Sequence, residues 1–430
     1  MTASAGKRRV LIIVENLSVP FDRRVWQEAT TLRDAGYEVS IICPTGKEYS
    51  DRFEILDGIR IYRHPLLHEA DGALGYALEY GSALFWEALL ACRVLVRPGF
   101  DVIHACNPPD TIFVLGMLFK LLGKRFVFDH HDINPELYEA KFGKRGALYR
   151  LILWLERMTF RTADVSIATN ESYRQIAIDR GGMAPNRVFV VRSGPDLRRL
   201  RIQPPVEALK NGRRFLVGYV GVMGKQEGID LLLRAVYHTV FTLRRTDVQF
   251  GLVGGGTEQE EMKQLAKRLR VADYVTFTGR VSDAEMLAML NTADVCVNPD
   301  VANAMNDKST MNKIMEYMAL GKPIVQFDLT EGRFSAQGAS LYAKPNDFED
   351  LARQIVQLLD DPEQREQMGA LGRGRVEEEL EWRYEAPKLL RAYDTVFGAP
   401  QISASRSNTP TDTRTEPAAN VGGARRRVRA

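Results

Sequence analysis

Residues 306–325, NDKSTMNKIMEYMALGKPIV, place three side chains of complementary chemistry on one predicted short helix. Asn312, Lys313 and Glu316 are three or four positions apart, so they project from neighbouring positions near the start of that helix. The unpaired N–H groups of a helix N-terminus favour a phosphate, and a carboxylate one turn deeper favours sugar hydroxyls. The pattern therefore indicates a sugar nucleotide as ligand. The alternative is a surface helix on which Lys313 and Glu316 only pair with each other in water.

The ends of this helix follow from the residues around it. Ser309 or Thr310 is predicted to cap its start, and Gly321 and Pro323 to end it. The apolar run 324–327 predicts a strand directly afterwards, so the helix belongs to an α/β layer.

The size and charge of the chain favour a globular protein of two domains. It has 430 residues, which is more than one ordinary core contains, and 45% of them are apolar, as in a globular protein. The net charge is +3, but residues 401–430 hold six arginines against two carboxylates, so the remainder is slightly negative. That balance gives no indication of nucleic-acid binding.

Cysteine usage and hydropathy predict a cytoplasmic protein. Cys43, Cys92, Cys106 and Cys296 lie far apart, three of them in or beside apolar strand-like runs, so buried reduced thiols are expected. No apolar run approaches the roughly 18 residues of a membrane-spanning helix. We therefore expect a soluble protein, attached at most peripherally to the inner face of the cell membrane.

Strand and helix patterns alternate along the chain, which predicts two doubly wound α/β domains, each with a parallel sheet. The Pro- and Gly-containing stretch 192–214 has no clear periodicity and separates them, so the predicted domains are 1–198 and 199–383. Residues 384–398 are predicted to form a helix that packs back on the first domain. Residues 400–430 have few apolar side chains and are expected to form a disordered basic tail, with attraction to anionic lipid or nucleic acid as the alternative.

Two tandem units of this kind imply a cleft with ligands at the carboxyl ends of the strands. Gly224, Lys225 and Gln226 lie in a glycine loop after the first strand of the second domain, which predicts a phosphate cradle; a plain loop with a solvated lysine is the alternative. Gly254 and Gly255 predict a second turn that approaches the ligand; the alternative is a tight turn without a ligand role. Thr257 with Glu260 predicts a capping box at the start of the next helix.

The histidine pair in FDHHD, residues 128–132, ends a predicted strand of the first domain. Adjacent residues on an extended segment point to opposite faces, so one histidine is expected at the cleft and a two-histidine metal site is not. The absence of GxGxxG after the opening strand of either half gives NAD little support.

Three segments carry a family resemblance: GYVGVMGKQEGIDLLLRA, the run from LVGGGTEQEEMKQLA to VTFTGRVSDAEMLAMLNTADVCVNPD, and NKIMEYMALGKPIV. They resemble the nucleotide-binding domain of family 4 retaining glycosyltransferases with the GT-B fold. The first half, with RRVWQEATTLRDAGYEVSIICP and FDHHDINPELY, is similar to the acceptor domain of the O-antigen and exopolysaccharide branch. The resemblance implies sugar transfer from a nucleotide-sugar donor with retention, without a metal or other cofactor.

The resemblance also implies roles for single residues. Glu316 matches the glutamate that holds the donor ribose, and His131 matches the cleft histidine beside the donor sugar. Gly279 and Val281 bound the loop that contacts the base through its backbone.

At three positions the chain departs from the family's pattern. Lys308 stands where the family has the glutamate that seats the donor sugar, so Asp307, Ser309 and the helix N-terminus are the expected substitutes. Val222 and Glu227 replace the Arg and Lys that neutralise the diphosphate. Lys313 is the predicted replacement, with Lys225 second.

The mechanism implied is attack by the acceptor hydroxyl on the face that the nucleotide leaves, a donor phosphate oxygen taking its proton. The predicted acceptor is a glycan on a polyprenyl diphosphate. Helix 147–161 has four nearby arginines around apolar residues and either lies on a membrane surface or packs in the core. A GT-B epimerase or phosphorylase and a non-catalytic nucleotide-sugar-binding homologue are the rival functions.

Overall fold

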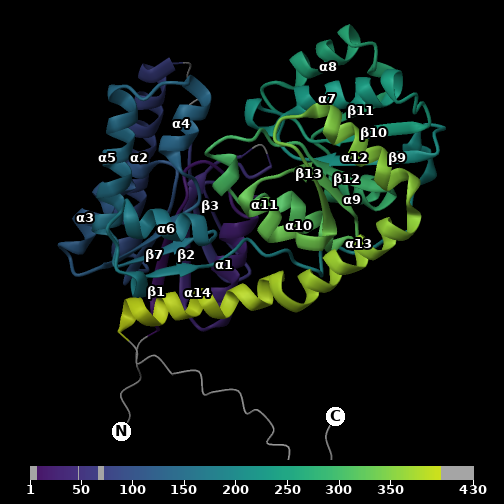
Figure 1. Cartoon of the computed structure of the whole chain (residues 1–430). Helices are drawn as coiled ribbons and strands as arrows, with labels where there is room; N and C mark the ends of the chain where they lie inside the picture. Colours follow the sequence, from purple (N-terminus) through teal and green to yellow (C-terminus); the bar gives the residue numbers. More distant parts are fainter. Residues whose placement is uncertain (1–6, 47, 66–71, 399–430) are drawn as a thin grey trace, which may run out of the picture.

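The computed structural model describes residues 7–46, 48–65 and 72–398, apart from the side chains of 72–80, and contains two α/β domains (Figure 1). The first is built on an eight-stranded sheet of order β3-β4-β2-β1-β5-β6-β7-β8. All of its pairings are parallel except that between β3 and β4. The strands are β1 Arg9–Ile13, β2 Glu38–Pro44, β3 Phe53–Leu56, β4 Ile59–His64, β5 Val102–Cys106, β6 Arg125–His130, β7 Val165–Ala168 and β8 Val188–Val190.

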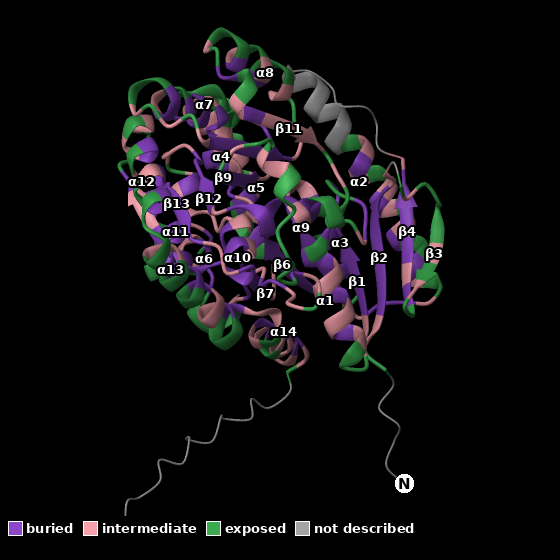
Figure 2. Cartoon of the chain, turned by 90° about the vertical axis from the view of Figure 1, so that its right-hand side faces the viewer, coloured by how far each residue is buried: buried purple, intermediate pink, exposed green. Residues whose placement is uncertain are grey.

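Helices cover both faces of this sheet, because its buried strands are apolar on both sides. On one face Leu11 and Ile13 pack with residues of α2, α3 and α6, and on the other face Ile12 packs with α1. Figure 2 shows the buried residues between the helices and the strands. The helices of this domain are α1 Arg23–Asp34, α2 Gly72–Val96, α3 Phe113–Lys120, α4 Asn134–Phe142, α5 Ala147–Thr162 and α6 Glu171–Asp179.

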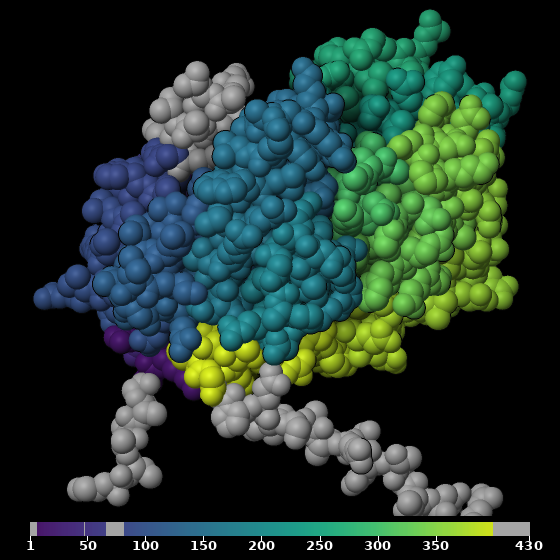
Figure 3. All heavy atoms as spheres, turned by 60° about the vertical axis from the view of Figure 1, so that its left-hand side comes forward, coloured from purple at the N-terminus to yellow at the C-terminus, as the bar shows by residue number. Residues whose placement is uncertain are grey.

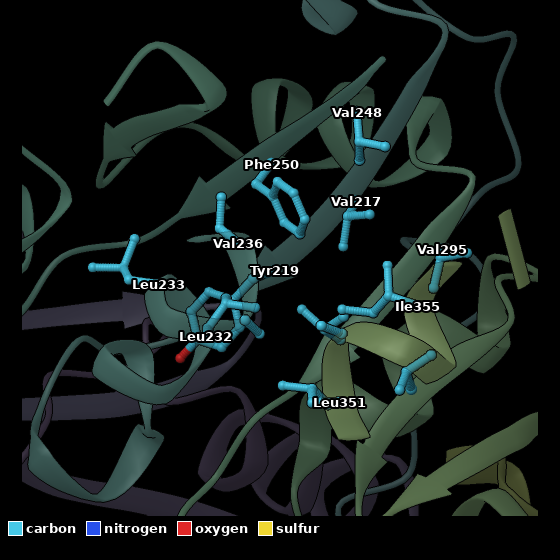
Figure 4. Packing of buried hydrophobic residues seen from close by; sticks show 14 of the residues in the cluster. Val217, Tyr219, Leu232, Leu233, Val236, Val248, Phe250, Val295, Leu351 and Ile355 are labelled. Carbon is cyan, nitrogen blue, oxygen red and sulfur yellow. The ribbon is translucent and has the colours of Figure 1, made fainter. Parts of the chain in front are cut away.

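The second domain has a six-stranded parallel sheet of order β11-β10-β9-β12-β13-β14. Val217, Tyr219 and Phe250 pack against α7 and α12, as Figure 4 shows, while Leu216 and Cys296 pack against α9 and α10 on the opposite face. The strands are β9 Phe215–Val220, β10 Val248–Val253, β11 Val275–Gly279, β12 Val295–Asn298, β13 Ile324–Phe327 and β14 Ser340–Ala343. The helices are α7 Ile229–Tyr237, α8 Gln259–Arg268, α9 Asp283–Thr292, α10 Asn312–Ala319, α11 Thr330–Ala336, α12 Phe348–Asp360 and α13 Pro362–Arg375.

The last described helix, α14 Trp382–Phe397, returns to the first domain (Figure 1). Leu389 and Tyr393 belong to the core of that domain, and the Tyr393 hydroxyl lies 2.8 Å from His104 Nδ1. The predicted boundary at 198/199 falls between β8 and β9, and its position stays a prediction. The expected basic tail, 400–430, lies outside the described residues.

Some expectations from the sequence need correction. The capping box of Thr257 and Glu260 is wrong, because Glu258 precedes α8 and no side chain caps that helix. Cys43, Cys106 and Cys296 are buried and Cys92 is exposed, all as free thiols. Within the part of the chain that the structure describes, no helix is long and apolar enough to cross a membrane.

Candidate active site

A pocket of about 400 Å³ opens between the two domains. Its wall in the first domain comes from loops that follow β1, β6 and β7 and from the start of α1. Its wall in the second domain comes from the loop after β9, from Asp300 and from residues 305–306 and 309–313. Six of the predicted site residues line it: His131, Gln226, Ser309, Thr310, Asn312 and Lys313.

Lys313 lies deep in this pocket and is paired with an aspartate that the sequence did not single out. Its Nζ is 2.7 Å from Asp300 Oδ1 and 5.0 Å from the centre of the Tyr219 ring. Burial opposes ionisation of Lys313, but the charge of Asp300 holds the pKa of Lys313 above its ordinary value. Asp300 follows β12 at its carboxyl end, and this position was the available signal for it.

The pocket around Lys313 carries more negative charge than positive. Burial raises the pKa of both Asp300 and Glu227, and the positive charge of Lys313 counters that rise in each case. Asp300 Oδ2 is buried and has no hydrogen-bond partner among the described residues. Glu227 Oε2 accepts from the backbone N–H of Gly224. Lys313 is thus ion-paired with Asp300, and its charge also acts on the nearby Glu227.

Glu316 faces a second, adjoining hollow of about 180 Å³, which Asn312 also lines. Its Oε1 lies 2.5 Å from Arg199 Nη2 and 3.4 Å from Arg23 Nη1. The alternative in which Lys313 and Glu316 pair with each other is therefore wrong. Lys313 thus lines one hollow and Glu316 the next, with Asn312 between them lining both.

Residues 308–310 make contacts between the two domains and do not cap α10. The prediction that Ser309 or Thr310 caps this helix is wrong, because Met311 precedes it and no side chain caps it. The Ser309 hydroxyl instead lies 3.0 Å from the Tyr173 hydroxyl, and Thr310 Oγ1 accepts from Asn170 Nδ2 at 3.0 Å.

The two side chains before Ser309 are also engaged. Lys308 Nζ lies 3.7 Å from Glu136 Oε1 in the first domain. Asp307 accepts hydrogen bonds from the backbone and hydroxyl of Thr330. Asp307 is therefore held at the start of α11, away from the pocket lining.

His131 lies at the pocket in a network of buried charges. Its Nε2 is 2.5 Å from Asp129 Oδ2 and 3.0 Å from Arg24 Nε, and Arg24 Nη2 is 3.1 Å from Glu28. Burial opposes ionisation of Asp129, but the charges of Arg24 and His131 hold the pKa of that carboxyl well below its ordinary value. His130 is fully buried among the rings of Phe128, Phe160 and Tyr173, on the side of the strand away from His131.

Two groups around Asp129 have side-chain atoms close enough to hold a metal ion, His104 with Cys106 and Glu28 with His131. The guanidinium of Arg24 already bonds Asp129 and Glu28, so a cation there would have to compete with it. The expectation of a metal-free reaction stays a prediction.

The predicted glycine positions are not among the residues that line the pocket. Gly254 N–H donates to Gly279 O, and a side chain at Gly254 would place its Cβ 1.9 Å from Gly221 O. The glycine therefore permits the close approach of two loops. Gly224, Lys225, Gly255 and Val281 likewise do not line the pocket among the described residues.

Comparisons with known proteins agree with this architecture. Residues 22–194 match the model of the family described as Glycosyl transferase 4-like domain, and residues 214–361 match that described as Glycosyl transferases group 1. Glycogen synthase of Mycobacterium tuberculosis is 23% identical over 398 residues, covering 86% of this chain and 90% of that protein. Phosphatidyl-myo-inositol mannosyltransferase of Mycolicibacterium smegmatis is 24% identical over 379 residues, covering 87% and 90%.

Among solved structures, HepE from Anabaena in complex with UDP-glucose matches with a TM-score of 0.69. Its identity to this chain is 15%, and the match covers 90% of this chain and 99% of HepE. The two family models together span most of the chain, one on each side of the interdomain pocket. The chain therefore belongs to the glycosyltransferases with the GT-B fold, with a 4-like domain followed by a group 1 domain.

Proposed function

We propose that this protein is a retaining hexosyltransferase that moves a sugar from a nucleotide-sugar donor to a glycan acceptor. The observation that carries the proposal is that α10 turns Lys313 and Glu316 into two adjoining hollows of the interdomain cleft, with His131 in the opposite wall. A nucleoside diphosphate needs this combination, because its ribose favours a carboxylate and its phosphates favour cations and free N–H groups.

Each of the three residues has a distinct task. Glu316 accepts hydrogen bonds from the ribose hydroxyls, displacing Arg23 or Arg199. Lys313 faces the diphosphate and stabilises the charge that develops on it as the glycosidic bond breaks. His131 holds the donor sugar, and its buried partner Asp129 keeps the ring in place.

The reaction then needs no protein nucleophile. The acceptor hydroxyl attacks the anomeric carbon from the face that the diphosphate leaves, and a departing phosphate oxygen takes the hydroxyl proton. The protein contributes by holding both substrates in contact and by excluding water from the cleft.

For the acceptor, we propose a lipid-linked glycan at the inner face of the cell membrane, in the synthesis of a cell-surface polysaccharide such as lipopolysaccharide or exopolysaccharide. The similarity to a phosphatidyl-myo-inositol mannosyltransferase, whose name implies a lipid acceptor, supports this proposal.

Thermal-shift screening of a nucleotide and nucleotide-sugar panel tests the donor, since a bound ligand raises the Tm by mass action. A mixed lipid extract with the best donor then tests transfer, and NMR of the product tests retention at the anomeric carbon. No Tm shift with any uridine, guanosine or adenosine diphosphate would contradict the donor assignment.

A non-catalytic nucleotide-sugar-binding homologue is the second candidate, favoured by the ion pair that already holds Lys313 against Asp300. It predicts a Tm shift with a donor but neither transfer nor sugar release. Sugar release in the absence of an acceptor would instead indicate a GT-B epimerase.

A further inference from the structure

The cleft segment of the first domain, residues 131–133, belongs to no helix or strand. It joins the end of β6 to the start of α4, and two of its side chains, His131 and Asp132, line the interdomain pocket. Backbone N–H groups outside helices and strands need other partners, because burying them unpaired is unfavourable. The position of these two side chains therefore depends on what binds the backbone that carries them.

One buried side chain, Asn107, binds that backbone. Its Oδ1 accepts hydrogen bonds from the N–H of His131 at 2.7 Å and from the N–H of Asp132 at 3.1 Å. Its Nδ2 donates to the carbonyl oxygen of Asp132 at 2.7 Å. Asn107 directly follows β5, which pairs with β6, so it stands beside the point at which β6 ends. We call these three hydrogen bonds the Asn107 clamp.

A fourth hydrogen bond fixes the orientation of the amide. Asn107 Nδ2 also donates to Asp110 Oδ1 at 3.0 Å, and Asp110 Oδ2 accepts from Asn134 Nδ2 at 2.7 Å. The amide then uses both acceptor positions of its oxygen and both donor positions of its nitrogen. A reversed amide would place its nitrogen against two donors and its oxygen against two acceptors. The clamp is therefore complete in one orientation only.

The clamp lies inside the first domain and behind the cleft. Figure 3 brings the outer side of that domain forward and shows its blue and teal atoms closely packed. Asn107 is only 1% exposed, and it is not one of the residues that line the pocket. It is therefore out of reach of a substrate in the cleft and can act on one only through His131 and Asp132.

We propose that Asn107 is a positioning residue for sugar transfer, which sets the places of His131 and Asp132 in the cleft through their backbone. His131 depends on its place in particular, because its Nε2 lies 2.5 Å from Asp129 Oδ2 while the residue also lines the pocket. A shift of the segment by about 1 Å would break that contact, and a misplacement of this size can lower turnover about a hundredfold.

The inference rests on the proposed function for its effect on turnover. The effect on the His131 ring involves no substrate, so the two ideas can fail separately. The first measurement therefore observes the ring in the free protein.

Asn107→Ser removes the amide and is the variant for this measurement. NMR of the full chain with ¹⁵N-labelled histidine reports on the Nε2 of His131, and His131→Gln identifies its signal among the six histidines. We expect the signal to move in Asn107→Ser, because the hydrogen bond between His131 and Asp129 is lengthened or lost.

A similar buried amide in the second domain provides the matched control, Asn291→Ser. Asn291 is 4% exposed, and it too binds backbone groups: it donates to Leu287 O and Arg201 O and accepts from the N–H of Gln203. The control should lose stability in a circular dichroism melt, as Asn107→Ser does, but should leave the His131 signal in place.

Turnover with the donor and acceptor found by screening is the second measurement. Asn107→Ser should lower kcat at least about tenfold, whereas the Kd of the nucleotide should stay within about twofold, because the proposed contacts of the nucleotide are in the second domain. A purely structural role would lower the stability of both serine variants alike and leave the kcat of the folded protein unchanged.

A further pair of variants decides the matter if Asn107→Ser does not fold. Asn107→Asp places a second carboxylate against Asp110, whereas Asn107→Asp/Asp110→Asn exchanges the two groups and keeps the total charge. The exchanged pair can still accept from both N–H groups of the segment. It should regain at least about threefold in kcat over Asn107→Asp, and its His131 signal should lie nearer to that of the wild type.

The outcomes separate the clamp from the proposed function. An unmoved His131 signal in Asn107→Ser would overturn the proposal, and so would an equal shift in Asn291→Ser or no difference between the two aspartate variants. A moved signal with an unchanged kcat would contradict the role in transfer. If the wild type transfers no sugar, the proposed function is wrong, and the NMR comparison still decides whether Asn107 positions His131.

Discussion

Arg199 Nη2 lies 2.5 Å from Glu316 Oε1, and the second carboxylate partner of this arginine is Asp283. Arg23, at the start of α1 in the first domain, contacts the same two carboxylates. Four charges from α1, α9, α10 and the interdomain segment thus meet beside the cleft. The carboxylate proposed to bind ribose is therefore held by arginines before a donor arrives.

Arg23→Gln should tighten the binding of UDP or another accepted nucleotide by about two- to fivefold. The ribose then competes with one arginine fewer for Glu316, and a half-exposed ion pair is worth at most about 1 kcal/mol. Titration calorimetry measures the change. Arg33→Gln, on the same helix but paired within the first domain, should leave the Kd unchanged. Weaker binding by the Arg23 variant would show that Arg23 contacts the nucleotide instead.

Glu316→Gln should lower nucleotide affinity at least tenfold, about 1.4 kcal/mol, while the protein stays folded. An amide accepts hydrogen bonds from the ribose less strongly than a carboxylate does. The exposed Glu366→Gln on α13 is the matched control. An unchanged Kd for Glu316→Gln, measured by calorimetry, would remove this residue from the site.

Lys313→Met should lower the free energy of unfolding by about 3 kcal/mol, because it leaves Asp300 buried without its cation. Lys313→Met/Asp300→Asn should regain most of that stability in urea unfolding. If Lys313 stabilises the departing diphosphate, turnover of the double variant should still fall more than tenfold. Turnover within twofold of wild type would mean that the lysine only balances Asp300.

Glu87→Gln should change how stability depends on pH. Burial raises the pKa of the Glu87 carboxyl to about 8, so the folded state keeps a proton that the unfolded chain releases near pH 4.5. The wild type should lose stability as the pH rises from about 4.5 to about 8, by up to about 1.4 kcal/mol per pH unit from this group.

Urea unfolding at pH 5.5, 6.5 and 7.5 measures that slope. The glutamine variant should have a flatter slope and should be more stable than wild type at pH 7.5. Parallel slopes for the two proteins would show that Glu87 is ionised in the folded state.

Buried strands and the helices between them were predictable because burial leaves a direct mark on sequence. β13 begins and ends at the predicted residues, 324 and 327, since both faces of a parallel sheet are covered and the run is largely apolar. β3 was not predicted, because it is a short edge strand of alternating exposure with no such run. α4 was not predicted either, since its apolar residues do not gather on one side.

The candidate site also has one part that the sequence predicts and another part that it does not. The residues of α10 and the histidine after β6 stand in local patterns, so the sequence by itself determined that Lys313, Glu316 and His131 belong at a cleft between two α/β domains. The residues that form ion pairs with Lys313 and Glu316 do not stand in such local patterns. Asp300 is in another loop. Arg23 is 293 residues from Glu316 in the chain, and Arg199 is 117 residues from it.

Only the tertiary structure decided which charges meet, because a salt bridge depends on the distance between side chains and not on their separation in sequence. It turned Lys313 and Glu316 towards different hollows and gave each a buried or half-buried partner of opposite charge. It also left Leu151 and Trp154 of α5 exposed, although a crossover helix ordinarily buries its apolar residues against its sheet. Local residue types thus selected the fold and the candidate site, and packing set the charge and accessibility of each group.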